Sequence, residues 1–356
     1  MKVGILTYHN AYNYGAVLQC YALQEYIKSM GHEVEVIDYR NEWVEGIYKP
    51  LSVCVVRRYL NRPKALAGYI KAIGKRWQKW IRKKKQYGEF VHAYLNLSHR
   101  VRKICPSDYD VIIIGSDQMW GLSCLGGVFD EVYLGKFESY GTRLIGYAIS
   151  TDFNSMNLLS ERGQLKDIMN RFHMISFRES VYASLARKCT NMDVCTCVDP
   201  TLLLQPSGWE KLLNDKWKSR KYVAIYQVRK RIGNEEYIYE LAKKCACSIG
   251  KGCEVVDLDP GYSVEDFVSA IKNAQIVITS SFHATAFSVI FGTRFYSVKL
   301  DDGYDDRYVN LLQKLGLESR LLDLSCAMID YRTPLPKFSM SDAIKPSVEF
   351  LNKALS

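Results

Sequence analysis

Short runs of apolar residues alternate along the chain with longer stretches in which apolar residues recur every three or four positions. The short runs are typical of strands buried on both faces, and the longer stretches are typical of amphipathic helices. This alternation predicts an α/β protein in which helices cover parallel sheets. The predicted strands are 2–7, 33–39, 110–114, 143–150, 173–177, 222–228, 253–258, 275–280 and 295–300.

The strands fall into two series, separated by Val198-Asp-Pro-Thr201. The proline disfavours helical backbone at the residue before it, so we place a hinge there. This predicts a first domain over 1–200 and a second over 201–356, the second with a terminal helix from about 341 to 355 that could pack on either domain. A chain of 356 residues is long enough for two such cores.

The stretch from about 45 to 100 interrupts the alternation. Twelve Lys or Arg residues and no acid lie between Arg57 and Lys85, which exceeds the net charge of +10 of the whole chain. Apolar residues recur there at helical spacing, namely Leu66, Ile70, Ile73, Trp77 and Trp80 or Ile81. Such a basic helix either lies on an anionic membrane or packs its apolar stripe on the domain, and both readings stay open. Nucleic acid is not predicted, because no recognised binding module surrounds the patch.

Composition and the amino terminus indicate where the protein is located and which cofactors to expect. The chain begins with the strand-like run Lys2–Thr7 instead of a secretory signal, so we expect a cytoplasmic protein. Its eleven cysteines are then expected to be reduced thiols, and their spacing lacks the paired C-x-x-C pattern of zinc sites. We predict neither a metal nor a redox cofactor.

The loop after the first strand, Thr7-Tyr-His-Asn-Ala-Tyr-Asn-Tyr-Gly15, leads into a helical pattern. Backbone N–H groups and the positive dipole end at a helix start favour anions. Asn10, Tyr14 and Gly15 are therefore candidate ligands of an anion or a sugar. The loop lacks G-x-G-x-x-G, so a dinucleotide is not favoured.

Two further strand ends carry candidate ligands. The strand 110–114 stops at Gly115-Ser-Asp-Gln118, so Ser116, Asp117 and Gln118 are candidates for the acceptor or the cleft; the alternative is a turn capped by the aspartate. Arg178 ends the strand 173–177, and its guanidinium suits phosphate or carboxylate. The alternative for Arg178 is an ion pair with Glu179 or another acid nearby.

His283 follows the strand 275–280 at a strand-to-helix turn. Ser280 or Ser281 is expected to cap the helix that begins there, which puts the imidazole at the helix amino terminus. A helix amino terminus disfavours imidazolium, so a histidine acting as an acid needs a bound anion nearby. The alternative is a neutral capping or core histidine.

Taken together, these segments resemble the polysaccharide pyruvyl transferase family. The matching pieces occur in the family's order over roughly residues 1–320, and the basic insertion is not part of the pattern. They are Gly4-Ile-Leu-Thr-Tyr-His-Asn-Ala-Tyr-Asn-Tyr-Gly-Ala-Val-Leu-Gln19, Ile37-Asp-Tyr39, Ile114-Gly-Ser-Asp-Gln118 with Trp120, Ile175-Ser-Phe-Arg-Glu179, Val198-Asp-Pro-Thr201 and Ser280-Ser-Phe-His283.

The resemblance implies two Rossmann-like domains facing across a cleft, as in GT-B glycosyltransferases. It also implies transfer of a pyruvyl group from phosphoenolpyruvate to a sugar of a cell-surface polysaccharide or of its lipid-linked precursor, forming a ketal. By position, His283 matches the catalytic histidine and Arg178 a donor-binding arginine. A carbohydrate-binding protein without activity and a glycosyltransferase using a nucleotide sugar are the alternatives.

One departure from the family pattern concerns the anion site. Some members have a basic residue two places before the histidine, where this chain has Ser281. We keep Ser281 as a donor-binding candidate and expect Arg294, Lys299 or Arg307 to supply the missing charge, with Arg307 also a candidate for the cleft.

Overall fold

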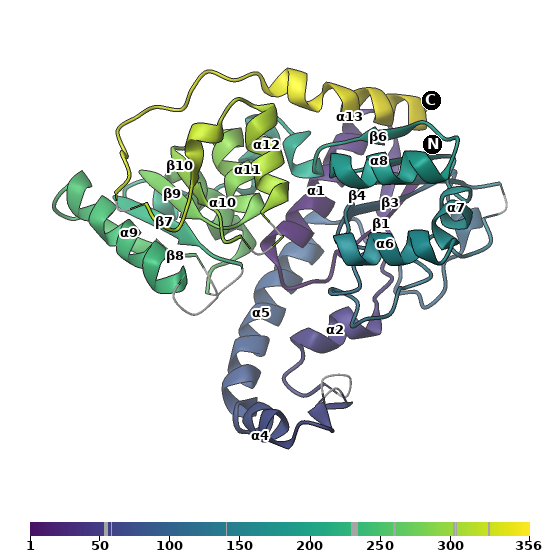
Figure 1. Ribbon diagram of the computed structural model, residues 1–356, viewed down its shortest axis with the longest axis horizontal. Helices are drawn as coiled ribbons and strands as arrows, with labels where there is room; N and C mark the ends of the chain where they lie inside the picture. The colour runs from purple at the N-terminus through teal and green to yellow at the C-terminus, as the bar shows by residue number, and fades with distance from the viewer. Residues whose placement is uncertain are drawn as a thin grey trace. The chain divides into compact units, whose positions relative to one another are not determined.

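The computed structural model describes the chain except for residues 53–55, 58, 140, 229–233, 259–260, 302, 304 and 327. The chain forms two compact units, which Figure 1 draws with their helices and strands labelled. Unit 1 comprises Met1–Leu203 and Pro346–Ser356, and unit 2 comprises Leu204–Lys345. The boundary lies just after the segment in which the sequence placed the hinge. The assignment of all of 201–356 to the second domain is wrong at its end, because Pro346–Ser356 belongs to unit 1.

Unit 1 is built on a six-stranded parallel sheet with the order β2-β1-β3-β4-β5-β6. Its strands are β1 (Lys2–Leu6), β2 (Glu33–Val36), β3 (Val111–Asp117), β4 (Arg143–Ile149), β5 (Met174–Phe177) and β6 (Val194–Thr196). Five of them are the strands predicted from the sequence. The sixth, β6, has only three residues, too few to stand out as an apolar run.

The helices of unit 1 include the crossovers that return the chain to the next parallel strand. They are α1 (Tyr14–Ser29), α2 (Glu42–Tyr48), α4 (Pro63–Lys71), α5 (Ile73–Tyr94), α6 (Phe153–Glu161), α7 (Gln164–Met169) and α8 (Ser180–Cys189), with the short 3₁₀ turns η1 (Pro106–Asp108) and η2 (Pro200–Leu202). Because the strands are parallel, their carboxyl ends share one edge of the sheet, where ligands of such folds usually bind.

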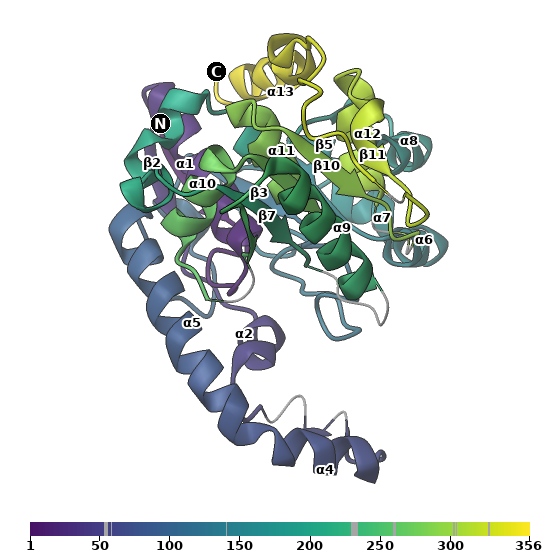
Figure 2. The ribbon, with the colours of Figure 1, turned by 90° about the vertical axis from the view of Figure 1, so that its left-hand side faces the viewer.

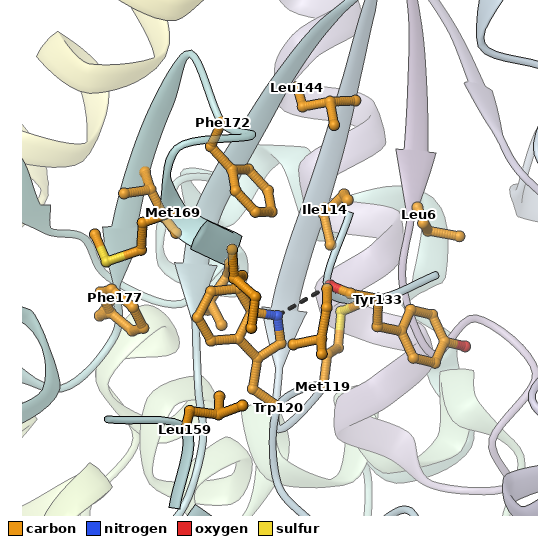
Figure 3. Packing of buried hydrophobic residues seen from close by; sticks show 14 of the residues in the cluster. Leu6, Ile114, Met119, Trp120, Tyr133, Leu144, Leu159, Met169, Phe172 and Phe177 are labelled. Carbon is orange, nitrogen blue, oxygen red and sulfur yellow. Dashed lines mark hydrogen bonds between the residues drawn. The ribbon is translucent and has the colours of Figure 1, made fainter. Parts of the chain in front are cut away.

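Trp120 anchors the hydrophobic core of unit 1 (Figure 3). Its ring is fully buried and packs near Phe172 and Phe177, with ring centroids 6.1 and 5.6 Å away. The indole Nε1 donates a hydrogen bond to the backbone carbonyl of Tyr133 at 2.9 Å, which satisfies the polar atom of this buried side chain. Trp120 therefore holds the chain just beyond β3, and its place in the family pattern has a packing explanation.

Unit 2 has a five-stranded parallel sheet with the order β11-β10-β9-β7-β8. The strands are β7 (Tyr222–Tyr226), β8 (Glu254–Asp257), β9 (Ile276–Thr279), β10 (Phe295–Val298) and β11 (Leu321–Leu322). The helices are α9 (Asn234–Ile249), α10 (Val264–Asn273), α11 (Phe282–Phe291) and α12 (Asp306–Lys314), with η3 (Pro206–Leu212), η4 (Asp215–Trp217) and η5 (Glu318–Arg320). Both units are thus Rossmann-like, as predicted. Among the strands that the described residues of unit 2 form, β11, two residues long, was not predicted.

The last helix, α13 (Met340–Ala354), contains the unit boundary at Pro346. Beyond this proline the helix packs on unit 1. The Ser347 hydroxyl accepts a hydrogen bond from the backbone N–H of Val198 at 2.8 Å, and the Phe350 ring lies 6.1 Å from that of Tyr147. Leu351 is fully buried. Both ends of the chain therefore build unit 1.

Between Pro63 and Tyr94, where every residue is described, the basic insertion forms two helices instead of one, because α4 ends at Lys71 and α5 starts at Ile73. Both helices extend away from the sheet of unit 1 (Figures 1 and 2). The expected apolar stripe is not packed on the domain along its length, since Ile70, Trp77 and Ile81 are about half exposed. No helix in the described part of the chain combines the length and the apolar character needed to cross a bilayer.

Candidate functional site

The loop after β1 uses some of its predicted ligand groups in hydrogen bonds within the protein. The helix begins at Tyr14, and Asn13 caps it: the Asn13 side chain accepts hydrogen bonds from the backbone N–H groups of Gly15 and Ala16, at 2.8 and 3.4 Å. Tyr14 is buried, whereas Asn10 is partly exposed. The N–H of Gly15, a predicted anion ligand, therefore already has an acceptor. Of the three predicted residues, Asn10 is the most accessible.

A buried polar cluster joins β1 to β2 and was not singled out in the sequence. His9 is almost fully buried, and its Nε2 lies 2.9 Å from Asp38 Oδ1, while its Nδ1 lies 3.2 Å from the carbonyl oxygen of Thr7. Arg40 donates from Nε and Nη2 to the two Asp38 oxygens, at 2.6 and 2.8 Å. Burial of Asp38 acts to raise its pKa, but the hydrogen bonds from His9 and Arg40 outweigh it and hold that pKa well below its ordinary value.

The end of β3 is compatible with both predictions for the Gly115–Gln118 segment, namely ligand contact and a turn capped by the aspartate. Ser116 is fully buried and its hydroxyl donates to the carbonyl of Ala148 at 3.0 Å. Asp117 adopts a positive φ of 84°, and its Oδ1 accepts the backbone N–H of Gln118 at 2.9 Å. Because Asp117 and Gln118 keep partial exposure, they remain able to meet a ligand, whereas Ser116 is committed to the interior.

Arg178 sits in the interior of unit 1 beside a carboxylate. Its Nη2 lies 2.7 Å from Asp199 Oδ2 and donates to Ser116 Oγ at 2.5 Å. The exposed fraction of its side chain is 4%, and that of Asp199 is 0%. Burial acts to lower the pKa of the guanidinium, but the negative charges of Asp199, Asp117 and Glu179 outweigh it and raise that pKa. Arg178 therefore forms the ion pair named as the alternative, with Asp199 as the partner, and its role in binding the donor stays a prediction.

Family motifs that are far apart in the chain meet in these two clusters. Asp38 lies in Ile37-Asp-Tyr39 and bonds to His9 of the first motif. Asp199 lies in Val198-Asp-Pro-Thr201 and pairs with Arg178. The signal for both acids was present in the sequence, but Ile37-Asp-Tyr39 was used only for the resemblance, and Val198-Asp-Pro-Thr201 only for the resemblance and as a hinge. Pairs of acidic and basic residues among the motifs are the clue that was missed.

His283 occupies the first turn of α11, at the carboxyl end of β9, as predicted. Ser281 is the residue that caps the helix: it has extended backbone, and its hydroxyl accepts from the N–H of Ala284 at 3.5 Å. The His283 ring makes an edge contact with Phe282 at 5.0 Å and is 9% exposed. The imidazole therefore lies at the positive end of a ten-residue helix, with a small part of its surface accessible.

Three arginine or lysine residues of unit 2 were candidates for the missing positive charge. Arg294 donates to the carbonyl of Tyr331 at 3.2 Å, and Lys299 lies 3.3 Å from Asp323, so both have structural partners. Arg307, in the first turn of α12, is partly exposed, and its buried Nε has no hydrogen-bond partner among the residues that the structure describes. Arg307 is thus the strongest of the three candidates.

The predicted site residues accordingly fall into two groups. In unit 1, Asn10, Tyr14 and Gly15 follow β1, and Ser116, Asp117, Gln118 and Arg178 lie at the carboxyl edge of the sheet, where Arg178 contacts Ser116 directly. His283 and Ser281 begin one helix of unit 2 and Arg307 begins the next.

Comparison with solved structures gives low similarity. The UDP-GlcNAc 2-epimerase from Neisseria meningitidis bound to UDP-GlcNAc is 10% identical, with 99% of this chain and 100% of that chain covered and a TM-score of 0.45. The S. aureus MnaA–UDP co-structure is 8% identical, with 99% and 87% covered and a TM-score of 0.47. SsfS6, a glycosyltransferase from Streptomyces sp. SF2575, is 9% identical, with 100% and 96% covered and a TM-score of 0.42. Similarity at this level does not indicate the function of this chain.

Comparison of the sequence with curated proteins and with family models gives a more specific result. No curated protein matches the chain. A family model described as polysaccharide pyruvyl transferase matches residues 13–302, which is well over half of the chain and includes the residues Arg178, Asp199 and His283. The match confirms the resemblance that the motifs indicated. The chain belongs to the polysaccharide pyruvyl transferase family.

Proposed function

We propose that this protein transfers a pyruvyl group from phosphoenolpyruvate to two hydroxyls of a sugar in a cell-surface polysaccharide or its lipid-linked precursor. The observation that carries the proposal is the position of His283, which is 9% exposed in the first turn of α11 at the carboxyl end of a parallel strand, in a chain of this family. Such strand ends are where open α/β sheets bind their ligands.

The chemistry follows from the donor. Proton transfer from the His283 imidazolium to the methylene carbon of phosphoenolpyruvate makes the adjacent carbon electrophilic. One sugar hydroxyl adds there, and its proton returns to the imidazole. The second hydroxyl then displaces phosphate, which leaves with the carbon–oxygen bond electrons, and its proton goes to the phosphate or to solvent. General acid catalysis of this kind contributes about two to four powers of ten in rate.

A helix amino terminus disfavours a protonated His283, but the negative charge of the donor offsets this effect. Phosphoenolpyruvate carries a carboxylate and a phosphate, and an anion beside His283 stabilises the imidazolium form. The same anion is attracted by the positive end of α11. We propose that Arg307 supplies a guanidinium that binds this anion, because its buried Nε has no hydrogen-bond partner among the described residues, whereas Arg178 is paired with Asp199.

The insertion supports a second part of the proposal, which is peripheral binding to an anionic membrane. Large apolar side chains are exposed on it and beside it, namely Leu51, Leu60, Ile70, Trp77 and Ile81. The surrounding stretch from Arg57 to Lys85 has no acidic residue. Apolar side chains that enter the interface and lysines that meet anionic lipids are the combination found in interfacial helices. Such binding would bring a lipid-linked acceptor to the enzyme.

The decisive experiment measures phosphate release from phosphoenolpyruvate by the purified full chain with a panel of free and lipid-linked sugars. The wild type is compared with His283→Ala and with His173→Ala, a matched change at an exposed histidine of unit 1. We expect acceptor-dependent release that is lost in His283→Ala and retained in His173→Ala. If no acceptor gives release, and a nucleotide sugar but not phosphoenolpyruvate raises the melting temperature, the glycosyltransferase alternative replaces this proposal.

A further inference from the structure

Unit 1 contains a groove of about 720 Å³ between the insertion helix α5 and the loops that follow β1 and β2. Its volume is in the range of small-molecule sites. One wall comes from α5, which supplies Trp80 and Lys84, and the other from the β1 loop and α2, which supply Tyr12 and Tyr48. Figures 1 and 2 both show α2 beside α5. None of the family motifs accounts for the α5 wall.

Aromatic rings are concentrated in the groove. The ring of Tyr12 is stacked on that of Tyr87, with centroids 5.7 Å apart, and lies 5.1 Å from the ring of Tyr48. Trp80 is partly exposed, and the ammonium of Lys84 lies 5.0 Å from the centre of its ring. Rigid aromatic faces bind the apolar face of a sugar ring at low entropic cost, and a cation beside the ring adds affinity for an anion.

The groove has an excess of positive charge. Five basic side chains line it, Arg40, Lys49, Lys84, Lys85 and Arg100, against the two acids Glu45 and Glu89. Arg40 is already paired with Asp38 and Lys85 lies 3.9 Å from Glu89, so the excess is smaller than this count. Glu45 is shared by two of the cations, with Lys49 at 3.7 Å and Arg100 at 3.1 Å. One carboxylate between two cations leaves room for a further negative charge, and a phosphate is the group that lysine and arginine together bind best.

We propose that this groove binds a phosphorylated sugar, and that it holds the glycosyl phosphate part of the acceptor. The aromatic rings would contact the pyranose, and the lysines the phosphate that joins the sugar to its carrier. Its assignment to the acceptor rests on the proposed pyruvyl transfer, whereas the binding itself does not. Because the insertion contributes one wall, it gives this chain an acceptor preference that the family motifs do not encode.

The ligand proposed for the groove differs chemically from the lipids proposed to bind the exposed apolar side chains of the insertion. A membrane headgroup presents phosphate without a sugar ring that stacks on tryptophan. The requirement for both a ring and a phosphate therefore distinguishes a glycosyl phosphate from a lipid headgroup or a free phosphate, and it can be tested in solution without vesicles.

The test is calorimetric titration of the full chain with glucose 1-phosphate and galactose 1-phosphate, with the two free hexoses, and with inorganic phosphate. The groove variant is Lys49→Gln, Lys84→Gln and Lys85→Gln together. The matched control is Lys28→Gln, Lys103→Gln and Lys166→Gln, which removes the same charge at exposed sites of unit 1 outside the groove. A third variant, Trp80→Ala, removes one aromatic face.

We expect at least one hexose phosphate to bind more tightly than the free hexose and than inorganic phosphate. The groove variant should weaken that binding about tenfold or more, and the control about twofold or less, because only the groove lysines contact the ligand. Trp80→Ala should weaken the binding of hexose phosphate and leave that of inorganic phosphate unchanged. This last contrast separates ring recognition from attraction by charge alone.

Equal weakening by the two lysine variants, binding that ignores the sugar ring, or no binding of either hexose phosphate would each overturn the inference. None of these outcomes bears on phosphate release from phosphoenolpyruvate, which tests pyruvyl transfer separately. If release occurs and the groove variant leaves the KM for a phosphorylated acceptor unchanged, the groove is not the acceptor site. If release fails but the groove still binds hexose phosphates as expected, only the assignment to pyruvyl transfer is lost.

Discussion

At the carboxyl edge of the first sheet, polar residues that look like ligands in the sequence are largely bonded to one another. Arg178 pairs with Asp199 and contacts Ser116, which lies 62 positions away in the chain. The N–H of Gly15 is taken by the side chain of Asn13. A single sequence identifies such residue types, but it does not reveal partners that only the fold brings together. His283 was easier to place, because its capping serine is two residues away.

The Arg178–Asp199 pair should contribute strongly to the stability of unit 1. Asp199→Asn leaves a buried guanidinium without its nearest carboxylate, which should lower the free energy of unfolding by about 3 kcal/mol or more. Urea denaturation followed by circular dichroism measures this. The control is Glu240→Gln, which breaks the exposed pair with Lys243 and should have little effect. Similar small changes in both variants would show that Arg178 does not depend on Asp199.

Asp38 should make stability depend on pH. Its pKa in the folded state is below its ordinary value of 3.8, so the carboxylate stabilises the fold at and above that pH, and the contribution is lost as pH falls further. Asp38→Asn should therefore lower the free energy of unfolding at pH 7, on the order of 2 kcal/mol, and by less at pH 3. Denaturation of both proteins at the two pH values gives the comparison. If the two proteins differ in free energy of unfolding by the same amount at pH 7 and at pH 3, this charge effect is excluded.

At the scale of elements, strands of four or more residues were predictable and shorter ones were not. The apolar runs gave all nine predicted strands close to their observed bounds, whereas β6 and β11, with three and two residues, carry too little pattern. The insertion was predicted as one amphipathic helix but breaks at Ala72. Its exposed stripe also could not be deduced, because an apolar periodicity does not say whether a partner covers it.

Membrane binding should depend on the outer part of the insertion. Exchange of Lys71, Lys75 and Lys79, all exposed, for glutamine should weaken binding to anionic vesicles about a hundredfold, since each lysine contributes about 1 kcal/mol near such a surface. Sedimentation with vesicles containing phosphatidylglycerol measures it. Ile70→Ala with Trp77→Ala should weaken binding too, whereas Lys28→Gln, Lys103→Gln and Lys166→Gln should not. Equal losses in all three variants would contradict a specific docking surface.

At the scale of the whole molecule, the chain forms two units with a boundary near Leu203, and its last residues, Pro346–Ser356, belong to unit 1 instead of the predicted second domain. The terminal helix was predicted, yet its target was not, because an amphipathic pattern shows a buried face without showing what buries it. Pro346 lacks the backbone N–H that an interior helical position uses, and it lies where α13 passes from unit 2 to unit 1.

The terminal helix should stabilise unit 1 in particular. Leu351→Ala removes a fully buried side chain, which should lower the free energy of unfolding by about 2–4 kcal/mol, whereas the exposed Asn352→Ala should change it little. Hydrogen exchange followed by mass spectrometry should show faster exchange in β4 and β6 of the variant and no change in β7 and β9. Faster exchange confined to unit 2 would contradict the assignment of this helix.

Pyruvyl transfer with His283 as the proton donor is tested most directly by mass spectrometry of the sugar acceptor after incubation with phosphoenolpyruvate in heavy water. We predict an acceptor heavier by pyruvic acid less one water, with one deuterium in the new methyl group, formed by the wild type and not by His283→Ala. An acceptor that remains unmodified, or one modified equally well by the variant, would contradict the account.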